Sequence, residues 1–96
     1  MSKMDAHLSD RGWVLFTKEN CNYCKKAKLL LPDAKIVPCD GVLQVGRQQF
    51  LHEMDQLTGQ EYRTFPMVFC DGKFVGGYTE TAKRIEQEHV FKMVEF

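Results

Sequence analysis

A strand-like run passes directly into a helical repeat near the start of the chain, and this junction constrains the fold most. Residues 13–17 read WVLFT, a short apolar run of strand-forming types. From Cys24 onward, apolar side chains recur at helical spacing as far as Leu31, and Pro32 ends the run. A strand followed by a helix is the first half of a strand–helix–strand unit, which joins parallel strands of one sheet.

The same alternation continues along the chain. Residues 34–39 predict a second strand, and Pro38 places it near an edge of the sheet or a strand end. Apolar residues recur at helical spacing over residues 43–57, and Gly59 ends this second predicted helix. Strand and helix therefore alternate twice before two strands follow each other directly.

The Asp71-Gly72 pair between two strand-like runs is a strong hairpin signal. It follows residues 67–70, which predict a third strand, and precedes residues 73–75, which predict a fourth. Two-residue Asp-Gly loops take the turn type whose twist matches that of paired strands. The third and fourth strands are therefore expected to be antiparallel neighbours.

A last helix follows the break at Gly76-Gly77. Thr79 or Thr81 is expected to cap its start, because threonine hydroxyls accept bonds from the free N–H groups of a first helical turn. The pattern leaves open whether residues 90–96 continue this helix. The order strand–helix–strand–helix–strand–strand–helix predicts an α/β fold, a mixed sheet with helices on both faces.

Size and charge exclude several classes of protein. The chain of 96 residues has room for one domain over residues 1–96, in which we expect residues 1–12 to be loosely held. With 13 basic and 13 acidic residues, nothing attracts nucleic acid or anionic lipid over long range. The start of the chain has no apolar signal-peptide core, and no run approaches the ~20 apolar residues of a membrane span. We therefore expect a cytoplasmic monomer without nucleic-acid or membrane partners.

Cys21 and Cys24 stand at the junction of the first strand and the first helix, in the sequence CNYC. The N–H groups at a helix start favour an anion, and a cysteine pKa falls from ~8.5 toward ~3.5–7.5 in such settings. Lys18, Lys25 and Lys26 add positive charge nearby. Cys21 is therefore expected to be the ionised nucleophile. Cys24, one turn along on the apolar side, is expected to stay protonated and to react second.

Metal binding or the absence of any chemistry are the alternatives for this pair. A structural zinc site needs four ligands in two groups. Cys39 and Cys70 are isolated within apolar strand segments, where free cysteine is commonly a small buried side chain. The histidines at positions 7, 52 and 89 form no paired ligand spacing. The sequence therefore favours a redox pair, and we predict no metal ligands.

Three motifs in order make the chain resemble the glutaredoxins, a family of the thioredoxin fold. CNYC at residues 21–24 resembles the family's Cys-Pro-Tyr-Cys, TFP at 64–66 its Thr-Val-Pro, and GGYTE at 76–80 its Gly-Gly segment with a following polar pair. QLTG at 56–59 resembles the end of its second helix. The resemblance spans residues 13 to about 89. It implies a dithiol glutaredoxin, with a four-stranded mixed sheet flanked by three or more helices.

The resemblance implies a glutathione-dependent thiol–disulfide oxidoreductase, with glutathione as co-substrate and no tightly bound cofactor. Its partners are disulfide-containing or glutathionylated proteins. Cys21 would attack the disulfide, and Cys24 or a small thiol would resolve the mixed disulfide. The residues that match the family's glutathione groove are Lys18, Tyr23, Thr64, Phe65, Pro66, Gly77, Tyr78, Thr79 and Glu80.

The groove positions have distinct implied roles. The family's proline at the position of Pro66 is cis, and it brings the backbone of Phe65 beside the cysteines, where it can pair with glutathione like an added strand. The N–H groups of Thr79 and Glu80, at a helix start, can hold the γ-glutamyl carboxylate. Lys18 would attract the other carboxylate of glutathione.

The chain departs from the family's pattern in two places. Asn22 replaces the proline inside the active-site motif, and the loss of a fixed φ is expected to shift the redox potential. Leu51 stands where many relatives have a glutamine that contacts glutathione. That contact is then absent, or it is supplied by Arg47 or Arg63.

Two other functions stand beside the leading one. An iron–sulfur glutaredoxin holds a [2Fe–2S] cluster between two subunits with its first cysteine and glutathione, and the missing motif proline would favour such an assembly. A thioredoxin-like enzyme is served by a reductase in place of glutathione. The sequence lacks the Trp-Cys-Gly-Pro-Cys motif that such enzymes usually carry, which makes this function less favoured.

Overall fold

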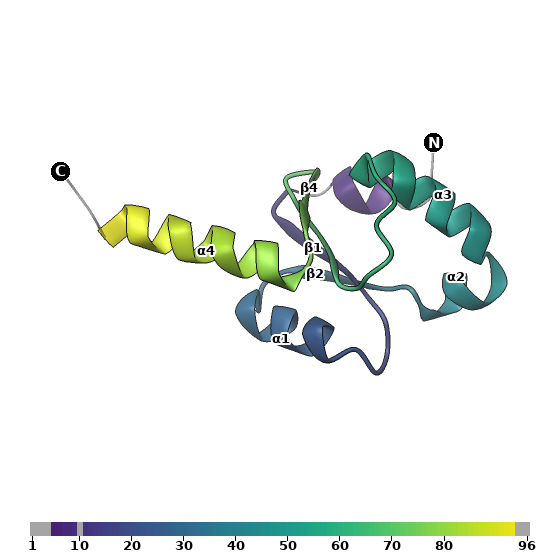
Figure 1. Cartoon of the computed structure of the whole chain (residues 1–96), viewed down its shortest axis with the longest axis horizontal. Helices are drawn as coiled ribbons and strands as arrows, with labels where there is room; N and C mark the ends of the chain where they lie inside the picture. The colour runs from purple at the N-terminus through teal and green to yellow at the C-terminus, as the bar shows by residue number, and fades with distance from the viewer. Residues whose placement is uncertain (1–4, 10, 94–96) are drawn as a thin grey trace.

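One four-stranded sheet carries helices on both faces, as the sequence predicts (Figure 1). The structure is a computed structural model, and it describes residues 5–9 and 11–93. Its elements are η1 (Asp5–Ser9), β1 (Trp13–Thr17), α1 (Asn22–Leu30), β2 (Lys35–Pro38), α2 (Asp40–Val45), α3 (Arg47–Thr58), β3 (Met67–Cys70), β4 (Lys73–Gly76) and α4 (Tyr78–Met93). Among the described helices, none has the length and apolar character needed to span a bilayer.

The strands lie in the order β2-β1-β3-β4, which makes the sheet mixed. β1 runs parallel to β2 and antiparallel to β3, and β3 runs antiparallel to β4. Leu15, at the centre of β1, lies opposite Ile36 on one side and Val68 on the other. β2 is an edge strand, so the position of Pro38 agrees with the prediction from the sequence.

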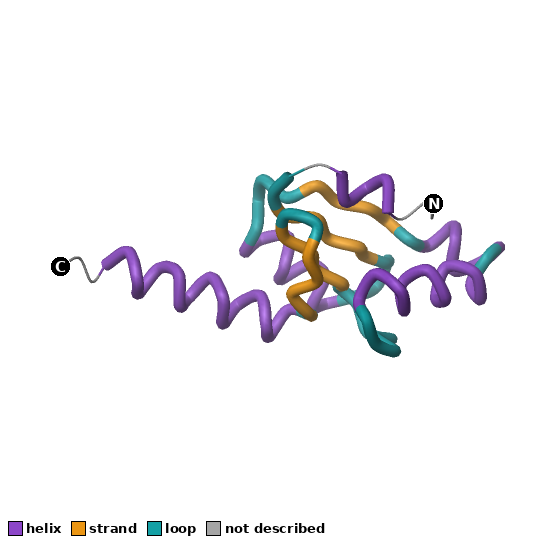
Figure 2. Tube along the Cα trace, turned by 90° about the horizontal axis from the view of Figure 1, so that it is seen from above, coloured by secondary structure: helices purple, strands orange, loops and turns teal. Residues whose placement is uncertain are grey.

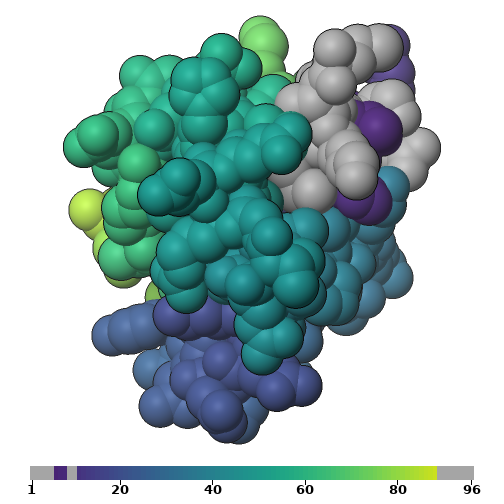
Figure 3. Space-filling model, turned by 90° about the vertical axis from the view of Figure 1, so that its right-hand side faces the viewer, coloured from purple at the N-terminus to yellow at the C-terminus, as the bar shows by residue number. Residues whose placement is uncertain are grey.

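Alternate residues of β1 supply two separate cores. Val14 and Phe16 point to the face that α3 covers, where they pack with Phe50. Leu15 points to the other face and packs with Ala27 of α1. Figure 2 shows the strands between the helices and α4 running out beyond the sheet. Figure 3 shows the face that α2 and α3 cover, drawn in teal.

The prediction of a single helix over residues 43–57 is wrong, because the segment is divided into α2 and α3 at Gly46. The Gly46 N–H donates to the carbonyl of Val42, and its own carbonyl accepts from the Phe50 N–H, both at 2.9 Å. Gly46 thus ends one helix and begins the next, and glycine is the residue that costs a helix interior most after proline. The predicted end at Gly59 is confirmed, with φ of 77°.

The predicted hairpin at Asp71-Gly72 is confirmed. Both residues have positive φ, 51° and 80°, as a two-residue hairpin loop of this type requires. The loop also holds the start of β1, because the Gly12 N–H donates to the Asp71 carboxylate at 2.7 Å. Of residues 1–12, expected to be loosely held, the described part includes η1, whose Leu8 packs against the core beneath α3.

The predicted cap of the last helix is wrong, because α4 begins at Tyr78, ahead of both Thr79 and Thr81. Thr81 is fully buried, and its hydroxyl donates to the Gly77 carbonyl at 2.8 Å. A buried hydroxyl needs such an acceptor, so the Thr81 side chain stabilises the first turn of α4 from a position within the helix. The helix continues to Met93, while residues 94–96 lie outside the described part.

Cys39 is a small buried side chain, as predicted. Only 1% of its surface is exposed, and its Sγ donates to the Val37 carbonyl at 3.4 Å. Burial, followed by the charge of Asp40, raises the pKa of the Cys39 thiol to about 12. The thiol therefore stays protonated in the folded protein at a pH where it ionises in the unfolded chain.

This difference makes the free energy of unfolding depend on pH. Above the ordinary cysteine pKa of 9.0, the unfolded chain loses the proton that the folded chain keeps, so the folded state loses stability as the pH rises. Between about pH 8 and about pH 10, we expect the Cys39 thiol to account for a loss of about 1.4 kcal/mol. Guanidinium unfolding of the wild type and Cys39→Ala under reducing conditions measures it. Equal losses in the two proteins would contradict this account.

Candidate active site

Cys21 occupies the cap position at the start of α1, as the sequence predicts. Its backbone is extended, with φ of −114° and ψ of 106°, and its Sγ accepts a hydrogen bond from the Cys24 N–H at 3.2 Å. The sulfur thus takes the place that an oxygen has in most helix caps. An N–H donor at a helix start favours a negatively charged acceptor, so the position suits a thiolate.

The Cys24 side chain is buried, whereas the Cys21 side chain is accessible. Only 1% of the surface of Cys24 is exposed, whereas Cys21 is half-buried. Burial and the hydrogen bond with Cys21 raise the pKa of the Cys24 thiol well above its usual value, although the backbone at Lys18 opposes the shift. Cys24 therefore stays a thiol at neutral pH, as predicted, and its role as the second cysteine to react stays a prediction.

The loop before β3 brings a backbone carbonyl to the sulfur of Cys21. The Phe65–Pro66 peptide bond is cis, as the resemblance implies. In its thiol form, Cys21 donates from Sγ to the Phe65 carbonyl at 3.5 Å, so residues 44 positions apart meet at the site. The Phe65 ring stacks on Phe50 with ring centres 6.4 Å apart, and Lys18 Nζ lies 5.6 Å from the centre of the same ring. The predicted residues Phe65 and Pro66 therefore belong to the loop beside Cys21, and Lys18 lies next to the Phe65 ring.

A hollow of about 310 Å³ opens beside this loop and the start of α4. Seven of its lining residues are ones that the resemblance implies, and the eighth, Tyr62, was not predicted. Lys18 is exposed, Pro66 is buried, and neither residue lines the hollow. The lining residues are Tyr23, Tyr62, Thr64, Phe65, Gly77, Tyr78, Thr79 and Glu80.

The start of α4 forms the polar end of the hollow. The Gly77 N–H donates to Glu80 Oε1 at 2.7 Å, so Glu80 caps its own helix from the third position. The first N–H group with an acceptor inside the helix is that of Thr81, which donates to the Gly77 carbonyl at 3.1 Å. The preceding N–H groups, of Tyr78, Thr79 and Glu80, have no intrahelical acceptor and can bind an anion.

Two tyrosines border the hollow on the side of α1. The rings of Tyr23 and Tyr78 lie 5.8 Å apart at 37°. Tyr23 is 56% exposed, and Lys26 Nζ lies 5.2 Å from the centre of its ring. The predicted groove residue Tyr23 is therefore open to a ligand on its outer face.

Some predicted positions take no part in the hollow. Leu51 packs against the core beneath α3, so it does not replace the family's glutamine. Arg63 forms a two-pronged ion pair with Asp55, at 2.6 and 3.1 Å, and it is not among the lining residues of the hollow. Arg47, the first residue of α3, is exposed. The suggestion that Arg47 or Arg63 supplies the missing contact stays a prediction.

Tyr62 is the lining residue that sequence reasoning missed. It lies in the loop QEYRT between α3 and β3, which reads only as a polar connection. Its ring meets Phe74 of β4 nearly edge-on, with centres 5.0 Å apart. A single aromatic residue in a polar loop is the one signal that would have drawn attention to it.

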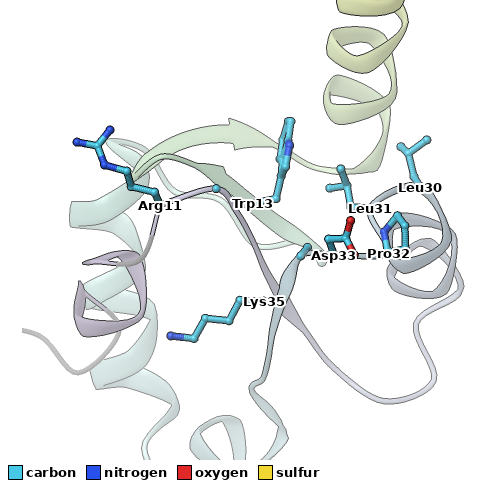
Figure 4. Close-up of a pocket in the computed structure, with 9 residues that line it drawn as sticks. Arg11, Trp13, Leu30, Leu31, Pro32, Asp33 and Lys35 are labelled. Atoms are coloured by element: carbon cyan, nitrogen blue, oxygen red, sulfur yellow. The ribbon is translucent and has the colours of Figure 1, made fainter.

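A second hollow, of about 340 Å³, lies at the other end of α1 (Figure 4). Trp13, Leu31 and Lys35 are among its lining residues, and neither cysteine of the pair belongs to it. Because Cys21 caps the opposite end of the same helix, this hollow is separate from the cysteine pair. Over residues 5–9 and 11–93, no three side chains of the types that bind metals come together.

Comparison with known proteins agrees with the geometry. The family model of the glutaredoxins matches residues 13–75. Glutaredoxin-2, mitochondrial, of Homo sapiens is 33% identical over 98 aligned positions, which cover 98% of this chain and 57% of that protein. Glutaredoxin-1 of Gallus gallus is 34% identical over 88 positions, covering 90% of this chain and 85% of its own. The chain thus spans little more than half the length of the human relative.

Solved structures show the same fold. The holo form of glutaredoxin C1 from Populus tremula x tremuloides superposes with a TM-score of 0.74 at 26% identity, covering 94% of this chain and 89% of its own. The buckwheat glutaredoxin–glutathione complex superposes with a TM-score of 0.75 at 25% identity, covering 95% and 83%.

Fold and site together define a protein of the thioredoxin fold with a cysteine pair at the start of its first α-helix. The match over residues 13–75 places it more narrowly: the chain belongs to the glutaredoxin family.

The start of α4 offers a direct test of this geometry. Gly76 has a φ of 134°, and a Cβ there would lie 2.7 Å from Glu80 Oε1 and 2.8 Å from its Cβ. We expect Gly76→Ala to lower the free energy of unfolding by about 2 kcal/mol, through backbone strain and loss of the Glu80 cap. Urea unfolding measures the change.

Gly41→Ala is the matched control. Gly41 lies in α2, and a Cβ there meets no atom within 4 Å. This substitution is expected to be neutral or to stabilise by up to about 1 kcal/mol. Equal changes in the free energy of unfolding of the two variants would contradict the close approach of Glu80 to Gly76.

Proposed function

We propose that the chain is a glutathione-dependent oxidoreductase, which reduces protein disulfides and glutathione mixed disulfides through Cys21 and Cys24. The observation that supports this most is the 3.2 Å hydrogen bond from the Cys24 N–H to the Cys21 sulfur, with the Cys24 thiol buried behind it. One sulfur is held ready to attack, and the other is kept protonated within reach of it.

The reaction would begin at the accessible sulfur. The Cys21 thiolate attacks one sulfur of a glutathionylated substrate, a bond forms between Cys21 Sγ and the glutathione sulfur, and the substrate leaves as a thiolate that takes a proton from water. A second glutathione thiolate then attacks the glutathione sulfur of the mixed disulfide. Oxidised glutathione leaves, and the Cys21 thiolate is restored.

A protein disulfide would use both cysteines. After Cys21 has formed a mixed disulfide with the substrate, Cys24 loses its proton and attacks Cys21 Sγ. The substrate leaves with both of its sulfurs reduced, and Cys21 and Cys24 form a disulfide. Two glutathione molecules then reduce that disulfide and become oxidised glutathione.

The hollow would hold glutathione during these steps. The backbone of Phe65 lies beside Cys21 Sγ and is placed to pair with the cysteinyl unit. The free N–H groups of Thr79 and Glu80 would bind the γ-glutamyl carboxylate. Lys18, exposed beside the Phe65 ring, would attract the glycine carboxylate. The buckwheat glutaredoxin of similar fold was solved as a glutathione complex, which supports the same ligand here.

The cellular location stays a prediction. The sequence led us to expect the cytoplasm, whereas the human and bovine relatives are named mitochondrial. Both compartments keep thiols largely reduced, so the proposed reaction is the same in either.

Serine substitutions separate the roles of the two cysteines. Cys21→Ser removes the nucleophile, so a glutathione-coupled assay on a glutathionylated peptide is expected to lose about a thousandfold or more of its rate. Cys24→Ser is expected to retain activity on that peptide, because glutathione can resolve the mixed disulfide, but to lose activity on a protein disulfide.

Cys70→Ser is the matched control, because Cys70 is half-buried at the end of β3 and outside the site. It is expected to match the wild type on both substrates. Equal activity of Cys21→Ser and Cys70→Ser would refute the proposed function.

A further inference from the structure

The contacts that hold Tyr62 in place involve its ring and its backbone and do not involve its hydroxyl. Its ring meets Phe74 at 72°, with centres 5.0 Å apart. Its N–H donates to the Gln60 carbonyl at 3.1 Å, and its own carbonyl accepts from Arg63 Nη1 at 3.2 Å. The ring and the backbone of Tyr62 are therefore both fixed, and the phenol oxygen is the part of Tyr62 that can bind a ligand.

The loop that carries Tyr62 is anchored to α3. The guanidinium of Arg63 forms two hydrogen bonds with the Asp55 carboxylate, at 2.6 and 3.1 Å. Such paired bonds fix orientation as well as distance, because the two planar groups must be aligned. An anchored backbone next to Tyr62 limits how far its side chain can move.

The Tyr62 hydroxyl lies against the start of α4. A Cβ built on Gly77 would lie 2.5 Å from Tyr62 Oη, so only a glycine permits this approach. Tyr62 Oη makes no hydrogen bond with residues 5–9 or 11–93. Every buried side-chain nitrogen or oxygen of that same part of the chain has a partner. The unpartnered hydroxyl must therefore be accessible, and the accessible space beside it is the hollow.

Both donors and acceptors lie around this hydroxyl. The N–H groups of Tyr78, Thr79 and Glu80 lack intrahelical acceptors at the same helix start. The acceptors are the Glu80 carboxylate, whose Oε1 lies 3.5 Å from the Gly77 Cβ position and accepts from the Gly77 N–H, and the Pro66 carbonyl oxygen, 3.6 Å from the same position. An anion bound here meets repulsion from Glu80, so a further donor at this end of the hollow has a clear use.

We propose that Tyr62 Oη donates a hydrogen bond to the γ-glutamyl carboxylate of glutathione, and that Tyr62 is thereby a specificity residue of this chain. The inference rests on the proposed function, because it assumes that glutathione occupies the hollow. Together with the N–H groups of Thr79 and Glu80, the phenol would supply a further donor to the carboxylate.

The hydroxyl then distinguishes glutathione from thiols that lack this carboxylate. A site built to hydrogen-bond a ligand group rejects analogues without that group, since its own polar groups lose their partner. If Tyr62 served only to pack against Phe74 and Gly77, removing the oxygen would affect all ligands of the hollow alike.

Tyr62→Phe isolates the oxygen, because phenylalanine keeps the ring that packs against Phe74. The probe is S-methylglutathione, which cannot exchange, with binding measured by calorimetry on the full chain. A hydrogen bond to a charged group predicts about tenfold weaker binding in the variant. The second probe is S-methylated γ-aminobutyryl-cysteinylglycine, in which only the γ-glutamyl carboxylate is missing. It is expected to bind the wild type and Tyr62→Phe equally.

The outcomes separate this inference from the proposed function. If the wild type turns over glutathione but the two proteins bind S-methylglutathione equally, the role of Tyr62 is refuted and the function stands. An equal loss for both probes would also refute it, since the effect would not depend on the carboxylate. A wild type that neither binds S-methylglutathione nor uses glutathione would overturn both proposals.

Discussion

The hydrogen bond from the Cys24 N–H to the Cys21 sulfur is the interaction on which the rest of the site depends. It forms because β1 ends at Thr17 and α1 begins at Asn22, so that Cys21 falls on the cap position between them. The parallel pairing of β1 with β2 directs α1 across one face of the sheet. The antiparallel pairing with β3 brings the Phe65 carbonyl to within 3.5 Å of the same sulfur. The sheet topology thus brings the cysteine pair and the Phe65 loop together from distant parts of the chain.

Burial gives two identical thiols different chemistry. Cys24 lies one turn inside α1 with 1% of its surface exposed, and burial keeps its proton on. Cys21 has an accessible sulfur and an N–H donor. Cys39 shares the deep burial of Cys24 and its raised pKa, but its sulfur faces the Val37 carbonyl and takes no part in the site. Position in the fold, and not residue type, therefore assigns the roles.

Local signals predicted most of the fold, whereas long-range contacts decided what the sequence could not show. The Asp71-Gly72 turn and the cysteine pair at a strand–helix junction depend on neighbouring residues, so both were read correctly. The break at Gly46 was missed although glycine disfavours a helix interior, because the apolar period continues across it. Tyr62 reaches the site only because its ring meets Phe74 and its hydroxyl meets Gly77. The seven other residues of the hollow came from family motifs, and a position outside every motif was invisible to that reasoning.

Competition between the cysteines for an alkylating agent tests the central claim most directly. Iodoacetamide is added briefly to the reduced wild type at about pH 7, and mass spectrometry of peptides assigns each modified cysteine. If the fold leaves only the sulfur at the start of α1 free to react, Cys21 is alkylated while the buried Cys24 and Cys39 remain unmodified. Alkylation of Cys24 as fast as that of Cys21 would contradict the account.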